Sequence, residues 1–168
     1  MSETHPLPLH TVRIKKLKSL LVIVENSVKG GDNYLFRNLY AEVDGKEVDI
    51  LENGGNSCAS FVSWILLTLE LIKLPHATVY ATEKDLLDSG WFEIKELRAG
   101  AVLIWEKREG AMLEDQKIPK EHIGFYVGND EAISNSSKAT GFPWKHSVTY
   151  DSTRNVAKIL WHPDLDNG

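Results

Sequence analysis

Cysteine is almost absent from this sequence, since Cys58 is the only one among 168 residues. A disulfide within the chain needs two cysteines. Zinc sites built from four cysteines, or from two cysteines and two histidines, also need at least two, so both kinds of site are excluded. The single thiol is therefore either a small side chain that fills the core or a reactive group.

Long hydrophobic runs and an excess of positive charge are also missing. The apolar run at 20–24 is too short for a signal-peptide core or a membrane span, and charged residues flank it closely. We therefore expect no membrane span and a cytoplasmic protein, with export by a route without a cleaved signal as the alternative. The 19 basic residues are mixed with 24 acidic ones, which predicts that nucleic acid is not a partner.

The length and composition are typical of one folded domain. Hydrophobic residues make up 42% of the chain and charged residues 26%, which excludes disordered and low-complexity classes. We expect a single domain over 1–168. In it, residues 1–9 form a flexible arm, residues 10–50 a helix and a hairpin, and residues 51–162 the core that would carry a catalytic site.

Hydrophobic periodicity predicts helices mainly in the first half of the chain. Apolar residues recur at helical spacing between His10 and Gly30, and the run from Cys58 to Lys73 is apolar on nearly every face. Thr82 is expected to cap a short third helix that ends at Ser89.

The second half of the chain has the alternation and turn signals of strands. Strands are predicted at 101–105, 123–127, 131–134, 147–150 and 156–161, with a connecting segment at 91–97 and a charged loop at 107–121. An earlier hairpin is expected around the turn Asp44-Gly45. This order predicts an α+β fold in which N-terminal helices pack on a central antiparallel sheet.

Cys58 lies where the central helix is expected to begin. Turn-forming residues precede it, and Asn56 or Ser57 can cap the helix. Unpaired backbone N–H groups and the positive end of the helix dipole favour an anion in the first turn, and a thiolate is such an anion. The position therefore supports a nucleophile as well as it supports a core filler.

A cysteine nucleophile needs a base, and His122 at the start of a predicted strand can supply it. His146 enters a strand in a similar way and is the second candidate. The other four histidines lie in or beside the N-terminal arm, at a helix exit or after the last strand: His5, His10, His76 and His162.

Three segments resemble motifs of the NlpC/P60 cell-wall peptidases, to which the CHAP amidases are related. They are the nucleophile motif at 56–62 (NSCASFV), the strand at 97–104 (LRAGAVLI) and the histidine motif at 122–129 (HIGFYVGN). The resemblance covers about residues 51–137 and implies a papain-like fold with Cys58 and His122 as the catalytic pair and without a metal or cofactor. Asn56-Ser57 and Gly100-Ala101 depart from the aspartates of the family motifs, so substrate contacts are expected to differ.

A third polar residue would orient the imidazole, and the family spacing places it at Ser134. A three-residue hairpin loop would turn Ser134 to the face of His122, whereas a two-residue loop would turn Asn135 there. An amide oxygen accepts the imidazole N–H better than a hydroxyl does, which favours Asn135.

Substrate-binding residues are suggested by the resemblance and by aromatic content. Family members often place a tyrosine upstream of the cysteine, and Tyr34 and Tyr40 are the candidates here. Trp144, with Phe142 and Trp64, can wall a cleft.

Together these features predict a cysteine hydrolase that cleaves an amide or peptide bond. The resemblance suggests peptidoglycan stem peptides as substrate, and a cytoplasmic peptide or a γ-glutamyl amide would fit equally well. Two alternatives stay open: a thiol acyltransferase with the same residues, and a binding module that keeps the fold without the chemistry. No feature of the sequence predicts the oligomeric state.

Overall fold

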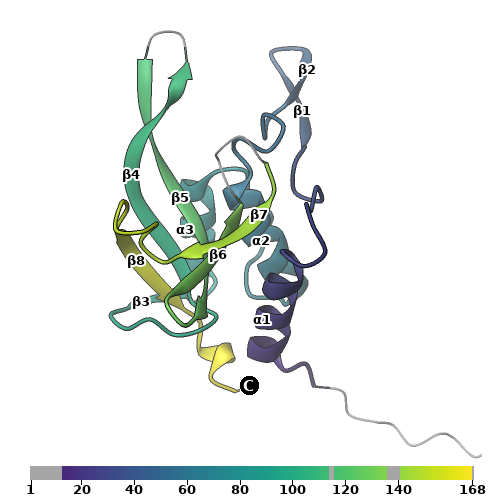
Figure 1. The fold of residues 1–168 in the computed structure, drawn as a ribbon. Coiled ribbons are helices and arrows are strands. Elements are labelled where there is room, and N and C mark those ends of the chain that lie inside the picture. The colour runs from purple at the N-terminus through teal and green to yellow at the C-terminus, as the bar shows by residue number, and fades with distance from the viewer. Residues whose placement is uncertain (1–12, 114–115, 136–140, 168) are drawn as a thin grey trace, which may run out of the picture.

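The structure is a computed structural model that describes residues 13–113, 116–135 and 141–167 (Figure 1). The expected arm at 1–9 lies outside the described residues. Among these residues the chain forms three α-helices, a 3-10 helix, a two-stranded sheet and a six-stranded sheet. The prediction of an α+β fold is confirmed.

The six-stranded sheet is antiparallel throughout, in the order β3-β8-β4-β5-β6-β7. Its strands are β3 Phe92–Ile94, β4 Val102–Leu113, β5 Gln116–Gly128, β6 Glu131–Asn135, β7 Pro143–Ser147 and β8 Val156–Trp161. The smaller sheet consists of β1 Tyr40–Val43 and β2 Lys46–Asp49. As predicted, Asp44 and Gly45 form its turn, and both have the positive φ that a type I′ turn requires.

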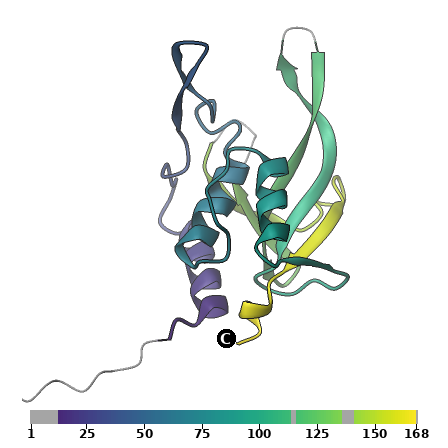
Figure 2. The same cartoon turned by 180° about the vertical axis from the view of Figure 1, so that it is seen from behind.

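The helices are α1 Lys16–Asn26, α2 Cys58–Thr68 and α3 Val79–Asp88, and the 3-10 helix η1 spans Pro163–Leu165. The three α-helices lie together on one side of the sheet (Figure 2). Apolar side chains of α2 and of the sheet form the main core between them, for example Phe61 and Phe125, whose rings meet edge to face at 5.8 Å. A helix that is apolar nearly all round is therefore central, as its composition predicted.

The other face of the sheet carries a second, smaller cluster. It contains Leu103, Trp105, Tyr126 and Ala132, and Val148 of the segment after β7 packs on it. The indole N–H of Trp105 donates to the Val148 carbonyl at 2.6 Å. The chain after β7 thus folds back over the face opposite α2.

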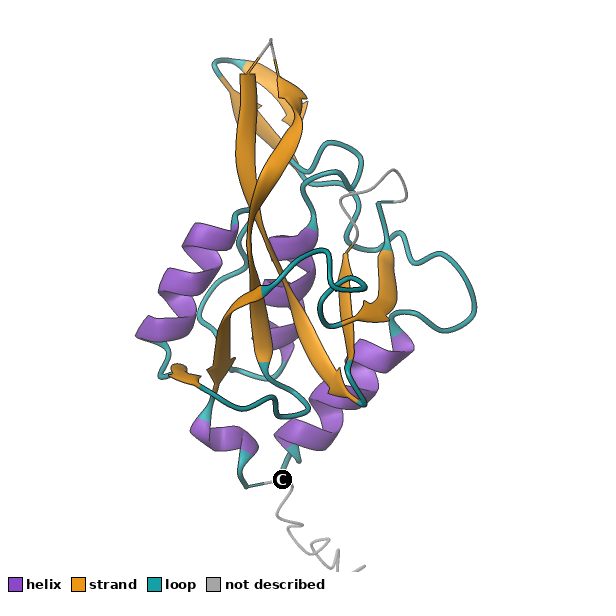
Figure 3. Cartoon of the chain, turned by 60° about the vertical axis from the view of Figure 1, so that its left-hand side comes forward, coloured by secondary structure: helices purple, strands orange, loops and turns teal. Residues whose placement is uncertain are grey.

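Several predicted boundaries are wrong. The described residues of the segment 107–121 form strands and not a loop, because β4 and β5 stay paired out to Leu113 and Gln116 and form a long hairpin that extends beyond the helices (Figure 3). The segment 91–97 contains the short strand β3, which pairs with β8. The strand expected at 147–150 ends at Ser147, since residues 148–150 are a turn.

All three α-helices also differ from prediction. The helix α1 covers only Lys16–Asn26 of the range expected between His10 and Gly30. The helix α3 begins at Val79 with Thr78 as its N-cap, whose hydroxyl accepts the Ala81 N–H, whereas Thr82 is buried inside the helix. The helix α2 stops at Thr68 because Glu70 adopts a positive φ and the Leu71 N–H returns to the Leu66 carbonyl.

The hairpin between β5 and β6 decides which residue faces His122. Its turn has two residues, Asn129 and Asp130, but a bulge lies between the pairs Tyr126–Ala132 and Gly128–Glu131. The extra residue shifts the register by one, so Ser134 and not Asn135 shares a face with His122. A two-residue turn with a bulge therefore has the effect expected of a three-residue loop.

Gly124 gives the Ser134 side chain room at this register. A Cβ on Gly124 would lie 2.7 Å from the Ser134 Cβ and 2.7 Å from the Ile133 carbonyl oxygen. We expect Gly124→Ala to lower the free energy of unfolding by about 1–3 kcal/mol, because the added methyl group overpacks the sheet. Chemical denaturation checks this, and an unchanged midpoint would contradict the register.

Candidate active site

Cys58 is the first residue of α2, and no side chain caps that helix. Ser57 occupies the N-cap position, but its hydroxyl donates to the Gly54 carbonyl at 2.8 Å and accepts from the amide of Asn135. The expectation that Asn56 or Ser57 caps the helix through its side chain is wrong. The N–H groups of the first turn therefore remain available to an anion at Cys58.

The Cys58 thiol lies beside the backbone of β5. Burial raises its pKa, while the N–H groups of Ile123 and Ala59 and the charge of Arg154 act in the opposite direction. The net direction is upward, so the resting group is a neutral thiol. Its surroundings nevertheless contain donors and a cation that stabilise a thiolate once the proton leaves.

His122 and Ser134 form the centre of a buried polar cluster on the sheet face opposite α2. The Ser134 hydroxyl lies 2.8 Å from His122 Nε2, 2.9 Å from His146 Nε2 and 3.0 Å from Tyr150 Oη. The ring of His146 stacks on that of Tyr150 at 3.9 Å between centroids. Both histidines that the sequence offered as a base therefore meet at one serine.

The hydrogen-bond partners fix where the protons lie. His146 Nδ1 is 2.8 Å from the Ser147 carbonyl, which can only accept, so Nδ1 carries the proton and Nε2 of His146 accepts from Ser134. The serine has one hydrogen to donate, and its oxygen then accepts from Tyr150 and from His122 Nε2. In this arrangement each of the three contacts of the serine oxygen has one donor and one acceptor.

The consequence for His122 is a defined tautomer. Its Nε2 carries the hydrogen, and its Nδ1 keeps a lone pair that no described residue engages through a hydrogen bond. Burial, with the charges of Arg154 and His146, lowers the pKa of His122 to about 3. Burial also lowers the pKa of His146 and raises that of Tyr150 to about 12, so the cluster is neutral near pH 7.

Cys58 and His122 line the same cavity, whose volume is about 1020 Å³. His146, Tyr150 and Arg154 line it as well. No hydrogen bond joins the Cys58 sulfur to the imidazole in the part of the chain that the structure describes. Proton transfer between them would therefore need a side-chain movement that brings the sulfur and the ring together.

Ser134, and not Asn135, contacts the His122 ring. The preference for Asn135 on chemical grounds is not supported, because the bulge in the hairpin turns its side chain to the α2 face. Asn135 instead fixes Ser57, the residue before Cys58, and its own Oδ1 is buried without a hydrogen-bond partner among the described residues.

The predicted substrate-binding residues are only partly brought to this cavity. Trp144 lines it and is 41% exposed. Tyr34 and Tyr40 do not line it and are 56% and 63% exposed, because β1, β2 and the segment before them lie apart from the sheet. Trp64 is exposed on α2 and does not line it either.

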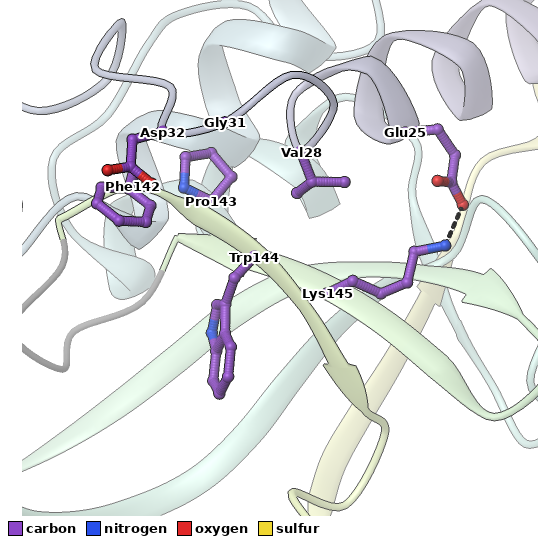
Figure 4. Close-up of a pocket in the computed structure, with 8 residues that line it drawn as sticks. All are labelled: Glu25, Val28, Gly31, Asp32, Phe142, Pro143, Trp144 and Lys145. Atoms are coloured by element: carbon purple, nitrogen blue, oxygen red, sulfur yellow. Dashed lines mark hydrogen bonds and ion pairs between the residues drawn. The ribbon is translucent and has the colours of Figure 1, made fainter.

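Phe142 lines a second cavity of about 490 Å³ between α1 and β7 (Figure 4). Trp144 borders both cavities, and Lys145 forms an ion pair with Glu25 at 3.0 Å across the second one. No cluster of nucleophilic or titratable groups like that at Ser134 lies among the described residues that line it.

The other described histidines have structural partners. His76 pairs with Asp85 at 2.8 Å, and His162 contacts the Ser89 carbonyl at 3.0 Å and caps η1. His5 and His10 lie outside the described residues.

Sequence reasoning missed Tyr150 and Arg154. Both belong to the turn-rich segment between β7 and β8, where no periodicity or motif marks them, and only the fold brings them to β5.

Among the described residues, no group of three or more His, Cys, Asp or Glu side chains is placed to hold a metal ion. Over the same residues, no helix is long and apolar enough to cross a membrane. A scan against protein-family models and a search of curated proteins found no match to this chain. The inference of a function therefore depends on the geometry of the cluster and the cavity.

The proton assignment predicts an NMR result. At pH 7, long-range ¹H–¹⁵N spectra should show His122 as the Nε2–H tautomer and His146 as the Nδ1–H tautomer. The His122 signals should remain those of a neutral ring as the pH falls, since its pKa is about 3. An Nδ1–H tautomer for His122, or its titration near pH 6.5, would contradict the arrangement.

Proposed function

We propose that this protein is a cysteine hydrolase that cleaves an amide or peptide bond, with a papain-like arrangement of the NlpC/P60 type. The observation that carries the proposal is the arrangement of the His122 ring. Ser134 accepts its Nε2–H, and its Nδ1 has no hydrogen bond to a described residue. The ring lines the same cavity as Cys58. A nucleophile, a base and a group that orients the base are the three parts that thiol catalysis requires.

The first half of the reaction forms a thioester. His122 Nδ1 takes the Cys58 proton as the sulfur attacks the substrate carbonyl, and the carbonyl becomes a tetrahedral oxyanion. The same nitrogen then gives the proton to the leaving nitrogen, the C–N bond breaks, and the amine departs. Ser134 keeps the ring in place during both transfers because it accepts the opposite N–H.

The second half regenerates the enzyme. A water molecule gives a proton to His122 Nδ1 and attacks the thioester carbonyl, the C–S bond breaks, and the proton returns to the Cys58 sulfur. The products are the carboxylic acid and the amine, so the sum of both halves is amide hydrolysis.

The oxyanion needs donors near Cys58. The Cys58 N–H is at the uncapped start of α2. Asn56 also lines the cavity, and its Oδ1 is held by Lys120 at 2.7 Å, which leaves its amide N–H groups to donate. We assign Asn56 the role of the second oxyanion donor, beside the Cys58 N–H.

A neutral Cys58–His122 pair at rest implies general-base catalysis and not a preformed ion pair. The low pKa of His122 makes its ring a weak base, and Arg154 and the helix N–H groups compensate by stabilising the thiolate as it forms. The resemblance suggests peptidoglycan stem peptides as the substrate class.

Variants at the cluster test this function. With peptidoglycan fragments and short peptides as substrates and mass spectrometry of the products, we expect Cys58→Ala to abolish cleavage and His122→Ala to lower kcat by about 10²–10⁴. Ser134→Ala should lower kcat by roughly tenfold or more with little change in KM, because the ring loses its acceptor.

Ser152→Ala is the matched control for Ser134→Ala, since Ser152 is exposed in a turn and does not line the cavity, and it should retain full activity. Cleavage that persists unchanged in Cys58→Ala would contradict the proposed nucleophile. An unchanged kcat in Ser134→Ala would remove the proposed role of the serine.

A further inference from the structure

Beside the candidate catalytic pair, three cations gather on one wall of the larger cavity. Arg108 of β4 and Lys120 of β5 are directly paired across the two strands, and Arg154 follows from the segment before β8. All three line the cavity that contains Cys58. Like charges on directly opposed residues of an antiparallel pair repel each other, so this arrangement costs stability.

Arg154 is held rigidly at the centre of this wall. It is only 9% exposed, and its Nε and Nη2 donate to the backbone carbonyls of Glu106 at 2.9 Å and Lys120 at 2.8 Å. Those two bonds anchor the guanidinium to β4 and β5. Its remaining N–H groups have no acceptor among the described residues.

None of these three cations forms an ion pair with a carboxylate in the described part of the chain, although the charge of Glu106 acts on Arg154 at longer range. The nearby carboxylate of Glu106 accepts from Asn155, and Glu121 is 3.8 Å from Lys107. Lys120 donates to the neutral amide of Asn56 at 2.7 Å.

The other acidic side chains that line the cavity do not balance this wall. Asp151 accepts from the Ser147 hydroxyl at 2.9 Å, and Glu52 forms no ion pair with a described residue. A buried cation is normally paired because its desolvation is costly, so an Arg154 without a carboxylate partner in the described chain points to a missing anion.

We infer that Arg154, with Arg108 and Lys120, binds a carboxylate group of the substrate next to the scissile amide. This inference rests on the proposed hydrolase function and names its substrate class: an amide or peptide that carries a free carboxylate close to the bond that Cys58 attacks. A guanidinium with two N–H groups fixed to the backbone presents the others in a planar fork, which matches the two oxygens of a carboxylate.

The single cysteine allows a test that needs no knowledge of the substrate. Iodoacetate and iodoacetamide alkylate the same sulfur by the same displacement of iodide, and only iodoacetate carries a carboxylate. The second-order rate constants of both reagents with Cys58 are measured on the full chain at pH 7.5 by intact-mass spectrometry. The rate constant for iodoacetate is divided by the rate constant for iodoacetamide, and this ratio is compared with the same ratio for free cysteine.

We expect this ratio to be about tenfold or more above that of free cysteine, and to fall as salt is added, because the cationic wall attracts the anionic reagent. Arg154→Gln should bring the ratio close to that of free cysteine, whereas Arg154→Lys should retain part of the preference. Since Arg154 is buried, Arg108→Gln and Lys120→Gln at partly exposed positions provide second variants, each with an expected several-fold decrease.

Lys84→Gln is the control, since it removes one positive charge from an exposed site on α3. It should leave the ratio unchanged. A wild-type ratio equal to that of free cysteine, or a raised ratio that none of the Arg154, Arg108 and Lys120 variants to glutamine lowers, overturns the carboxylate site. Failure of the proposed function is seen separately, as iodoacetamide alkylation of Cys58 that does not depend on His122.

Discussion

The hydrogen bonds of the Ser134 hydroxyl are the interactions on which the whole site depends. One small group accepts from His122 and Tyr150 and donates to His146, so it uses its one hydrogen and both lone pairs. The Ser147 carbonyl fixes the proton of His146 on Nδ1, and this in turn determines the direction of each hydrogen bond that Ser134 forms. The result is a His122 ring whose proton-accepting nitrogen is Nδ1.

The fold supports this group from two sides. The bulge in the β5–β6 hairpin places Ser134 on the face of His122, and the missing side chain at Gly124 leaves space for it. The adjacent residue, Asn135, points to the other face and fixes Ser57 at the start of α2. Two consecutive residues of one strand therefore position the candidate base and the candidate nucleophile, because alternate side chains of a strand point to opposite faces.

Much of the architecture was predictable because it depends on local patterns. The apolar run after Cys58, the Asp44-Gly45 turn and the strand at 156–161 each carry a periodicity or a turn signal that nearby residues determine. The pairing of β4 with β5 beyond residue 107 was not predictable, since charged residues are typical of loops as well as of exposed hairpins. The choice between Ser134 and Asn135 depended on one bulge, and Arg154 and Tyr150 reach the site only through long-range packing.

The central claim is that Cys58 is a nucleophile activated by His122 and not a buried, inert thiol. The most direct test is the rate of iodoacetamide alkylation of Cys58 between pH 5 and 9, in the wild type and in His122→Ala. We expect a wild-type rate at pH 6–7 that is several-fold above that of the variant, because the neutral imidazole takes the thiol proton as the new bond to sulfur forms, although the thiol is not ionised at rest. Identical rates in the wild type and in His122→Ala over the whole pH range would contradict it.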